Sequence, residues 1–249
     1  MTDVLTEVDG QVGRLTLNRP AAKNAISLGL ARELGEAVAK LAPAVDVIVI
    51  RGAGGTFCAG GDVAEVGRLR EAGREALAEL FAAFRGATAA IATAEVPVVA
   101  VVEGHAVAGG FELIQACDIV IAAETATFAD IHAKFGQVPG GGGSQLLPRL
   151  VGRMRASAHI LTGDSLTARQ ALSWGLVYEV HAPDELDAAV ADLVRRLSRG
   201  SRAARAASKR LIREGVEQPL AAGLDLELEA VLDHIMGSGG GRYDEGKST

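Results

Sequence analysis

Two glycine-rich turns are the parts of this sequence whose residue types and spacing are best suited to chemistry. Ala59–Gly61 follows the apolar run Val45–Arg51, and Gly109 follows the apolar run Pro97–Val102. Glycine lets backbone N–H groups approach a ligand closely, and a helix N-terminus adds partial positive charge. Two such turns together are suited to stabilise an oxyanion on a thioester or ester carbonyl. The alternative is that the glycines only permit tight strand-to-helix turns.

Glu112 lies three residues after Gly109, in the first turn of an expected helix that is otherwise apolar. Its carboxylate is therefore expected near the mouth into which the Gly109 N–H points. The helix dipole also favours an acidic residue in a first turn, without any catalytic role. A partly desolvated carboxylate at this place would have a raised pKa that suits proton transfer.

Asp130 and His132 precede a run of four glycines, Gly140–Gly143. Histidine carries protons near neutral pH, although solvent-facing and hydrogen-bonded histidines are about as common. The four glycines are expected to supply turn geometry before a helix that starts near Ser144, or to form a flexible loop. The remaining histidines have no partner that the sequence reveals and are predicted to be structural or surface residues: His105, His159, His181 and His234.

Composition argues against several other kinds of site. Cys58 and Cys117 are too few for a disulfide framework and lack the spacing of metal ligands, so we expect reduced thiols and no metal site. The segment Gly52–Phe57 does not match GxGxxG at its last position, and no GxxxxGK[ST] motif occurs. A nucleotide-binding site of either type is therefore disfavoured.

The charge and hydropathy of the chain limit the kinds of partner that it is expected to bind. The net charge of the 249-residue chain is −6, with acidic and basic residues interspersed, which argues against binding to nucleic acid or to a membrane surface. The N-terminus shows no leader pattern, and no segment reaches the roughly 18 uninterrupted apolar residues of a membrane span. We therefore expect a cytoplasmic protein without a membrane partner.

The elements that must position these residues alternate between strands and helices, which is typical of an α/β fold with parallel β-α units. Strands are expected at Val4–Val8, Val12–Leu17, Val45–Arg51, Pro97–Val102 and Asp118–Ala123, with a last strand near Val180. Helices are expected after Ser27 up to Pro43, at Val63–Ala94, Gly109–Ala116, Gln145–Val151 and on through Leu161, Thr167–Trp174, Asp184–Leu197, Ser201–Gly215 and Pro219–Met236. The polar tail is expected to be loose or packed only by Tyr243.

Five ordered motifs, spread over nearly the whole chain, resemble the enoyl-CoA hydratase/isomerase family, the crotonase superfamily. They are LTLNRPAAKNAIS at Leu15–Ser27, GTFCAGGD at Gly55–Asp62, EGHAVAGGFELIQACDIVIA at Glu103–Ala122, FGQVPGGGGSQLLPRLVG at Phe135–Gly152 and ALSWGLV at Ala171–Val177. The resemblance implies a crotonase-like spiral of repeated ββα units with a helical C-terminal region. It implies an acyl-CoA site in the spiral core, residues 1–190, and a helical oligomerisation region with a loose tail, residues 191–249. That region would build a homotrimer or hexamer.

The same resemblance assigns roles to individual residues. The two amides of an oxyanion hole would be those of Gly61 and Gly109. Lys23, Ala25 and Ala59 would lie along the adenine and pantetheine of coenzyme A, where Lys23 would meet a phosphate. No cofactor would be permanently bound, because the substrate itself arrives as a coenzyme A thioester.

The sequence departs from the family pattern at one catalytic position. Hydratases of this family carry a second glutamate where this chain has His132. We predict a hydratase that uses Glu112 and His132, with Asp130 as a possible helper. The alternatives are an isomerase, a thioester or C–C hydrolase, a decarboxylase, or a non-catalytic acyl-CoA binder, against which the retained Glu112 argues. The Ala-rich helix Glu71–Ala94 is expected to line the acyl pocket without specifying chain length.

Overall fold

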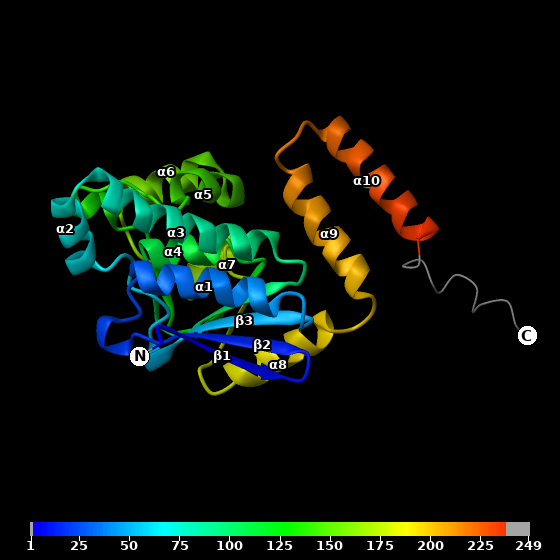
Figure 1. The fold of residues 1–249 in the computed structure, drawn as a ribbon, viewed down its shortest axis with the longest axis horizontal. Helices are drawn as coiled ribbons and strands as arrows, with labels where there is room; N and C mark the ends of the chain where they lie inside the picture. Colours follow the sequence, from blue (N-terminus) through cyan, green and yellow to red (C-terminus); the bar gives the residue numbers. More distant parts are fainter. Residues whose placement is uncertain (1, 238–249) are drawn as a thin grey trace, which may run out of the picture.

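A six-stranded sheet forms the centre of the computed structural model, which describes residues 2–237 (Figure 1). The strand order is β1-β2-β3-β4-β6-β9; β1 is antiparallel to β2 and the other pairs are parallel. The strands of this sheet are β1 Val4–Asp9, β2 Val12–Leu17, β3 Val47–Gly52, β4 Val98–Val102, β6 Ile119–Ala123 and β9 Glu179–His181. The predicted α/β class is confirmed.

A second, three-stranded sheet was not predicted. It consists of β5 His105–Val107, β7 Thr127–Ala129 and β8 Leu166–Thr167, in the order β5-β7-β8. Its strands are two or three residues long, too short for an alternating apolar pattern to reveal them. The sheet nevertheless matters for function, because β5 leads into one glycine turn and β7 leads to Asp130.

The α-helices largely follow the predicted pattern, with two breaks. They are α1 Leu28–Leu41, α2 Val63–Ala72, α3 Arg74–Thr93, α4 Gly109–Gln115, α5 Gly143–Val151, α6 Arg153–Thr162, α7 Ala168–Trp174, α8 Leu186–Leu197, α9 Arg202–Gly215 and α10 Leu220–Met236. The prediction of one helix over Val63–Ala94 is wrong: Gly73, at φ +114°, ends α2 and starts α3. Gly152, at φ +83°, likewise separates α5 from α6. Both angles favour glycine and are incompatible with a continuous helix.

Alternating strand residues build two apolar layers. Ile48 and Ile50 of β3 face the large core under α1, α3 and α4, whereas Val47 and Val49 face α8, which covers the other side of the sheet (Figure 1). This alternation is the period of two that a strand buried on both faces requires. By length and composition alone α3 is apolar enough to cross a membrane, but its buried Phe84, Ala87 and Ile91 belong to this core.

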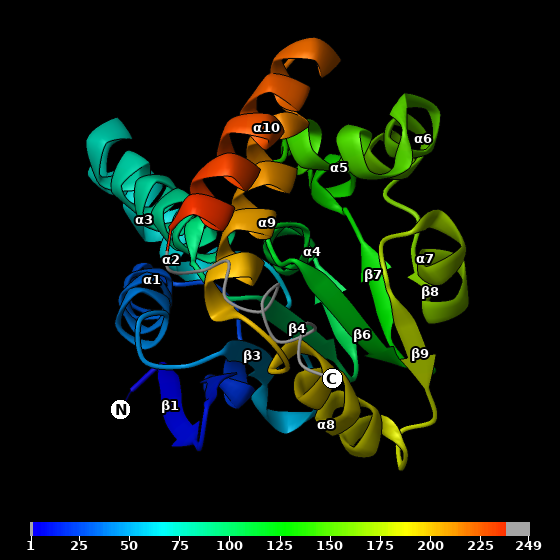
Figure 2. The same cartoon turned by 90° about the vertical axis from the view of Figure 1, so that its right-hand side faces the viewer.

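Helices α9 and α10 form a C-terminal arm that extends away from the sheet (Figures 1 and 2). No residue of α9 is buried, and basic side chains hold the helix to the core. Arg202 donates to carbonyl oxygens at the end of α1 and before β3, and the Lys209 Nζ lies 2.7 Å from Asp118 Oδ2. The predicted division at residue 190 falls inside α8, which packs on the sheet. The predicted loose tail with Tyr243 lies outside the described residues.

Candidate active site

The two glycine turns lie side by side. Strands β3 and β4 are parallel neighbours, so the segments that leave them emerge at the same edge of the sheet. Backbone hydrogen bonds join the segments: Cys58 N donates to His105 O over 3.0 Å, and Val107 N donates to Cys58 O over 2.9 Å. A Cβ atom placed on Gly109 would lie 3.6 Å from the Cα of Gly60. The structure thus brings together the two turns in which the sequence predicted an oxyanion site.

Both candidate amides are free of hydrogen-bond partners within the described part of the chain. Among residues 2–237, the N–H groups of Gly61 and Gly109 donate no hydrogen bond to any protein acceptor. Ala108, which precedes Gly109, has φ +48° and ψ −118°. Such a conformation costs a non-glycine residue about 1–3 kcal/mol and persists only where the surrounding structure enforces it. Two unpaired amides next to a strained residue have the geometry of a site that binds an oxygen atom.

Glycine is required next to this site for steric reasons. A Cβ on Gly110 would come within 2.3 Å of the Cys58 carbonyl oxygen, a distance that no side chain tolerates. The close approach of the two segments therefore depends on the small residue at position 110.

Glu112 is buried in the first turn of α4, as the sequence predicted. It is only 1% exposed, and its Oε1 accepts hydrogen bonds from Gly141 N at 2.7 Å and from Gly143 N at 2.9 Å. Burial raises the pKa of Glu112 above its ordinary value, although these two amides and His132 act in the opposite direction. With Oε1 held by the backbone, Oε2 remains available for proton transfer.

The amides of Gly141 and Gly143 were missed in the sequence, where the glycine run indicated only turn geometry or flexibility. Their contribution comes from the backbone, which carries no signal of residue type. The run of glycines is itself the signal that was available: a Cβ on Gly143 would lie 3.1 Å from Glu112 Oε1. A side chain at position 143 would force the loop or the carboxylate to shift, so glycine favours this close approach.

We expect Gly141→Ala to destabilise the protein by about 1–3 kcal/mol, the usual cost of overpacking a core. The added Cβ would lie 2.1 Å from Phe84 Cε1 and 2.8 Å from Glu112 Oε2. Urea unfolding measures the change. Gly86→Ala is the matched control, because nothing lies within 4 Å of a Cβ there, inside α3; it is expected to stabilise the protein by about 0.5–1 kcal/mol. Equal effects of the two substitutions would contradict the steric argument.

His132 faces Glu112 and is oriented by Asp130. Its Nδ1 lies 2.6 Å from Asp130 Oδ1, and its Nε2 lies 3.9 Å from Glu112 Oε2. Asp130 is fully buried, and its backbone N–H donates to the Nε2 of His159 over 3.1 Å. His159 therefore accepts at Nε2, and burial lowers its pKa. The structure thus brings together Glu112, His132 and Asp130, and His159 takes a structural position behind them.

Burial alone would lower the pKa of His132. The hydrogen bond and negative charge of Asp130, together with the charge of Glu112, outweigh burial and raise this pKa above its ordinary value of 6.5. Protonated His132 thus contributes stability that is fully present below the unfolded pKa and is lost as pH rises through the folded pKa.

We expect Asp130→Asn to lower the pKa of His132, measured by NMR titration of the imidazole C–H protons. The imidazole C–H signals of exposed His105, which contacts Thr127 instead, are the internal reference. An unchanged pKa of His132 would contradict the assigned pairing.

The three residues expected along coenzyme A lie next to the Gly61 turn. Lys23 is exposed at φ +50°, and its carbonyl oxygen accepts a hydrogen bond of 3.0 Å from Ala59 N. Ala25 is buried and directly precedes Ile26, which bonds to Gly60. The Lys23 ammonium forms no ion pair within residues 2–237. The cation is therefore available to an anionic ligand that passes Ala59 and Gly61.

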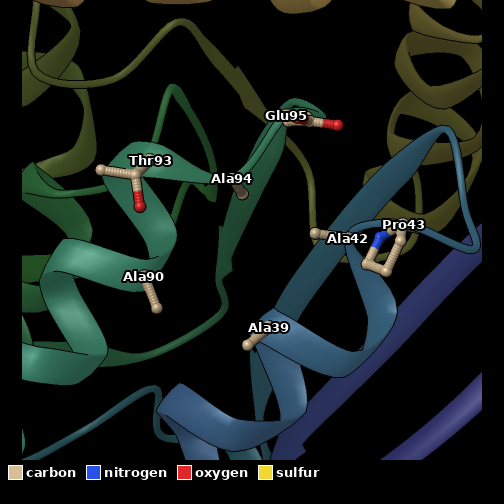
Figure 3. A pocket seen from close by; sticks show the side chains of 7 residues that line it. All are labelled: Ala39, Ala42, Pro43, Ala90, Thr93, Ala94 and Glu95. Atoms are coloured by element: carbon tan, nitrogen blue, oxygen red, sulfur yellow. The ribbon is translucent and has the colours of Figure 1, made fainter.

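Outside this site, three other features were candidates for binding or reactivity: metal-ligating side chains, the Cys58 thiol and a surface cavity. Among the described residues no group of three metal-ligating side chains could hold a metal ion. Burial raises the pKa of Cys58 to about 12, which leaves its thiol unreactive. A cavity of about 350 Å³ lies between the ends of α1 and α3 (Figure 3), but none of the candidate catalytic or coenzyme A-binding residues lines it. Its lining residues are Ala39, Ala42, Pro43, Ala90, Thr93, Ala94 and Glu95.

Comparison with known proteins agrees with this geometry. The sequence profile of the family described as "Enoyl-CoA hydratase/isomerase" matches residues 7–238. A Rhizobium meliloti (strain 1021) protein named "Probable enoyl-CoA hydratase" is 38% identical over 226 residues, which cover 90% of this chain and 86% of the relative.

Solved structures match over a similar extent. An enoyl-CoA hydratase from Mycobacterium smegmatis has a TM-score of 0.90 at 33% identity, covering 95% of this chain and 92% of that one. A protein from Thermobifida fusca YX, crystallised in complex with acetoacetyl-CoA, has a TM-score of 0.85 at 32% identity, covering 94% of this chain and 95% of that one. The predicted crotonase-like fold is thereby confirmed. The chain belongs to the enoyl-CoA hydratase/isomerase family.

Proposed function

We propose that this protein is an enoyl-CoA hydratase-like enzyme that stabilises a thioester enolate and adds water across the double bond. The observation that carries this proposal is the arrangement of Glu112 and His132, whose facing Oε2 and Nε2 atoms are 3.9 Å apart. That separation is too long for a direct hydrogen bond but suits one water molecule that contacts both groups. The two unpaired glycine amides of the neighbouring turns lie beside them.

In the proposed reaction the thioester oxygen accepts hydrogen bonds from the N–H groups of Gly61 and Gly109. The water oxygen bonds to Cβ while the Glu112 carboxylate takes one of its protons. The π electrons of the double bond move onto the thioester as an enolate, which the two amides stabilise. The imidazolium of His132 then gives a proton to Cα. Its raised pKa supports this role, because it keeps the imidazole protonated closer to neutral pH.

We propose that Lys23, Ala25 and Ala59 hold the coenzyme A portion of the substrate, with Lys23 at a phosphate. The acetoacetyl-CoA in the related Thermobifida fusca structure supports a ligand of this class. In this proposal no metal and no permanently bound cofactor takes part, the enzyme acts in the cytoplasm, and its partners include neither nucleic acid nor a membrane.

Isomerisation remains the second candidate, because it too needs the enolate and one or two proton carriers. The observation that favours isomerisation is that His132 stands where hydratases of this family carry a second glutamate. Hydrolysis, decarboxylation and simple acyl-CoA binding are the further alternatives. Incubation with crotonyl-CoA, followed by mass spectrometry and a thiol assay, distinguishes hydration, which adds the mass of water, from hydrolysis, which releases free coenzyme A. An isomerase, a decarboxylase and a binder do neither with this substrate. We expect the hydrated product, and free coenzyme A as the main product would overturn the proposal.

We also propose that the C-terminal arm assembles a homotrimer or hexamer. Large apolar residues of α10 are exposed on one chain and repeat at helical spacing: Leu220, Leu224, Leu228, Val231, Leu232 and Ile235. Of the residues of α10, only Ala230 is buried. An apolar helix face of this extent is typical of an interface between protein chains.

The double substitution Leu224→Glu and Leu228→Glu is therefore expected to dissociate the assembly into monomers at micromolar concentration. Burying a carboxylate at an apolar interface is strongly unfavourable. Light scattering after size-exclusion chromatography measures the mass. Glu229→Lys, at an exposed charged position off this apolar face of the same helix, is the control and is expected to leave the mass unchanged. A parent protein that is already monomeric would contradict the proposal.

A further inference from the structure

We infer that Arg19 is a positioning residue that polarises the Gly61 amide through a chain of two peptide groups. This inference rests on the proposed function, in which the Gly61 N–H donates to the thioester oxygen. It goes beyond that function by assigning a source of positive charge to one of the two donors.

Arg19 supplies the first link. Its side chain is 22% exposed and lies at the entrance to the loop that carries Lys23 and Ala25. The Nη1 group donates to the carbonyl oxygen of Ala25, and Nη2 lies 2.8 Å from Asp62 Oδ2. A cation thus bonds directly to a peptide carbonyl on the edge of the candidate site.

Two peptide groups supply the next links. The Ala25 carbonyl and the Ile26 N–H belong to one peptide group, and the Ile26 N–H donates to Gly60 O over 2.7 Å. The Gly60 carbonyl and the Gly61 N–H belong to the next. Both peptides are trans, so the N–H of each points opposite to its carbonyl. The chain therefore runs from the guanidinium through Ala25–Ile26 and Gly60–Gly61, and it ends at the unpaired Gly61 N–H.

Such a chain strengthens its final donor. A hydrogen bond to a carbonyl withdraws electron density from the N–H of the same peptide, and bonds in series reinforce one another by roughly 10–30% each. The chain begins at a full positive charge and ends where negative charge develops in the reaction. It also fixes the direction of the Gly61 N–H, because Gly60 O is held by Ile26. Both effects favour the enolate over the bound thioester.

Asp62 is the nearer of two counter-charges of Arg19, since Asp3 Oδ2 lies 3.7 Å from the Arg19 Nε. Its Oδ1 accepts from Glu65 N at 3.1 Å and so caps α2, while Oδ2 bonds to Arg19. Burial raises the pKa of Asp62, but the bond and charge of Arg19, together with the backbone N–H groups of Glu65 and Ala64, lower it below its ordinary value. Asparagine caps helices about as well as aspartate. Asp62→Asn thus removes the negative charge while retaining the cap and the peptide chain.

The test is the infrared stretching frequency of a ¹³C-labelled thioester carbonyl in bound butyryl-CoA, an analogue without the double bond. In the parent enzyme the frequency is expected to fall on binding. Arg19→Met is expected to lose a large part of this frequency shift. Its kcat with crotonyl-CoA is expected to fall on the order of tenfold, which is less than the 10²–10³-fold loss caused by deleting an oxyanion-hole donor. Its KM is expected to stay unchanged. Arg19→Lys keeps a cation and retains most of the shift, whereas Asp62→Asn enlarges it.

Arg32→Met is the control, because Arg32 is an exposed arginine of α1 that pairs only with Glu79 among the described residues; it is expected to leave the shift and kcat unchanged. A normal shift in folded Arg19→Met would overturn the inference. If that variant does not fold, Asp62→Asn decides, since an unchanged or smaller shift there would equally overturn it. The absence of any shift in the parent enzyme would instead contradict the oxyanion site itself, so the two failures are distinguishable.

Discussion

Replacing Glu112 by glutamine is expected to lower kcat for hydration of crotonyl-CoA by about a thousandfold, within the range that general acid–base catalysis contributes. Glutamine has the shape of glutamate, and its carbonyl oxygen can accept the hydrogen bonds from Gly141 N and Gly143 N. It cannot take a proton from water. Steady-state kinetics are therefore expected to show a loss in kcat with little change in KM.

The same variant is expected to fold at least as well as its parent at pH 7. Because burial raises the folded pKa of Glu112, the ionised carboxylate destabilises the folded state once pH exceeds the unfolded pKa. Glutamine removes this ionisation. Urea unfolding at pH 5 and pH 8 is expected to show the advantage of the variant growing with pH. Glu112→Gln enzyme with the parent's rate would contradict the assigned role.

Replacing His132 by alanine is expected to lower kcat by about a hundredfold, because the reaction loses the group that gives a proton to Cα. The pKa of His132 is raised, so the parent's activity is expected to fall on the alkaline side as pH rises through this folded value. The residual activity of His132→Ala is expected to lack that alkaline limb. The pH dependence of kcat measures both effects.

His132→Glu is the informative companion, since it restores the second carboxylate of the family pattern. We expect it to recover part of the activity lost in His132→Ala. The new carboxylate would have to be protonated to act as an acid, so its activity is expected to fall at a lower pH than the parent's. An alkaline limb that is identical in all three proteins would show that His132 is not the titrating group.

The sequence revealed the parts of this molecule that depend on residue type and short-range spacing. The apolar runs around β3 and β4 marked the buried strands, and their parallel pairing explains why the Gly61 and Gly109 turns lie together. Glu112 was correctly placed in a first helical turn, and Asp130 beside His132. The catalytic roles of these residues stay predictions until they are measured.

What the sequence could not reveal depends mostly on backbone atoms. The amides that bind Glu112 belong to Gly141 and Gly143, 29 and 31 residues further along the chain. Arg19 reaches Asp62 across 43 residues, and its bond to the Ala25 carbonyl has no signature in residue type. Only the tertiary structure brings such groups together, because a backbone donor is the same at almost every position.

The most direct test of the central claim is incubation with crotonyl-CoA in heavy-oxygen water, with the product read by mass spectrometry. The account predicts that the parent enzyme places labelled oxygen at Cβ, and that Glu112→Gln and His132→Ala each reduce this labelling by at least about a hundredfold. An unlabelled thioester, recovered from a parent enzyme that binds crotonyl-CoA measurably, would contradict hydration by this pair of residues.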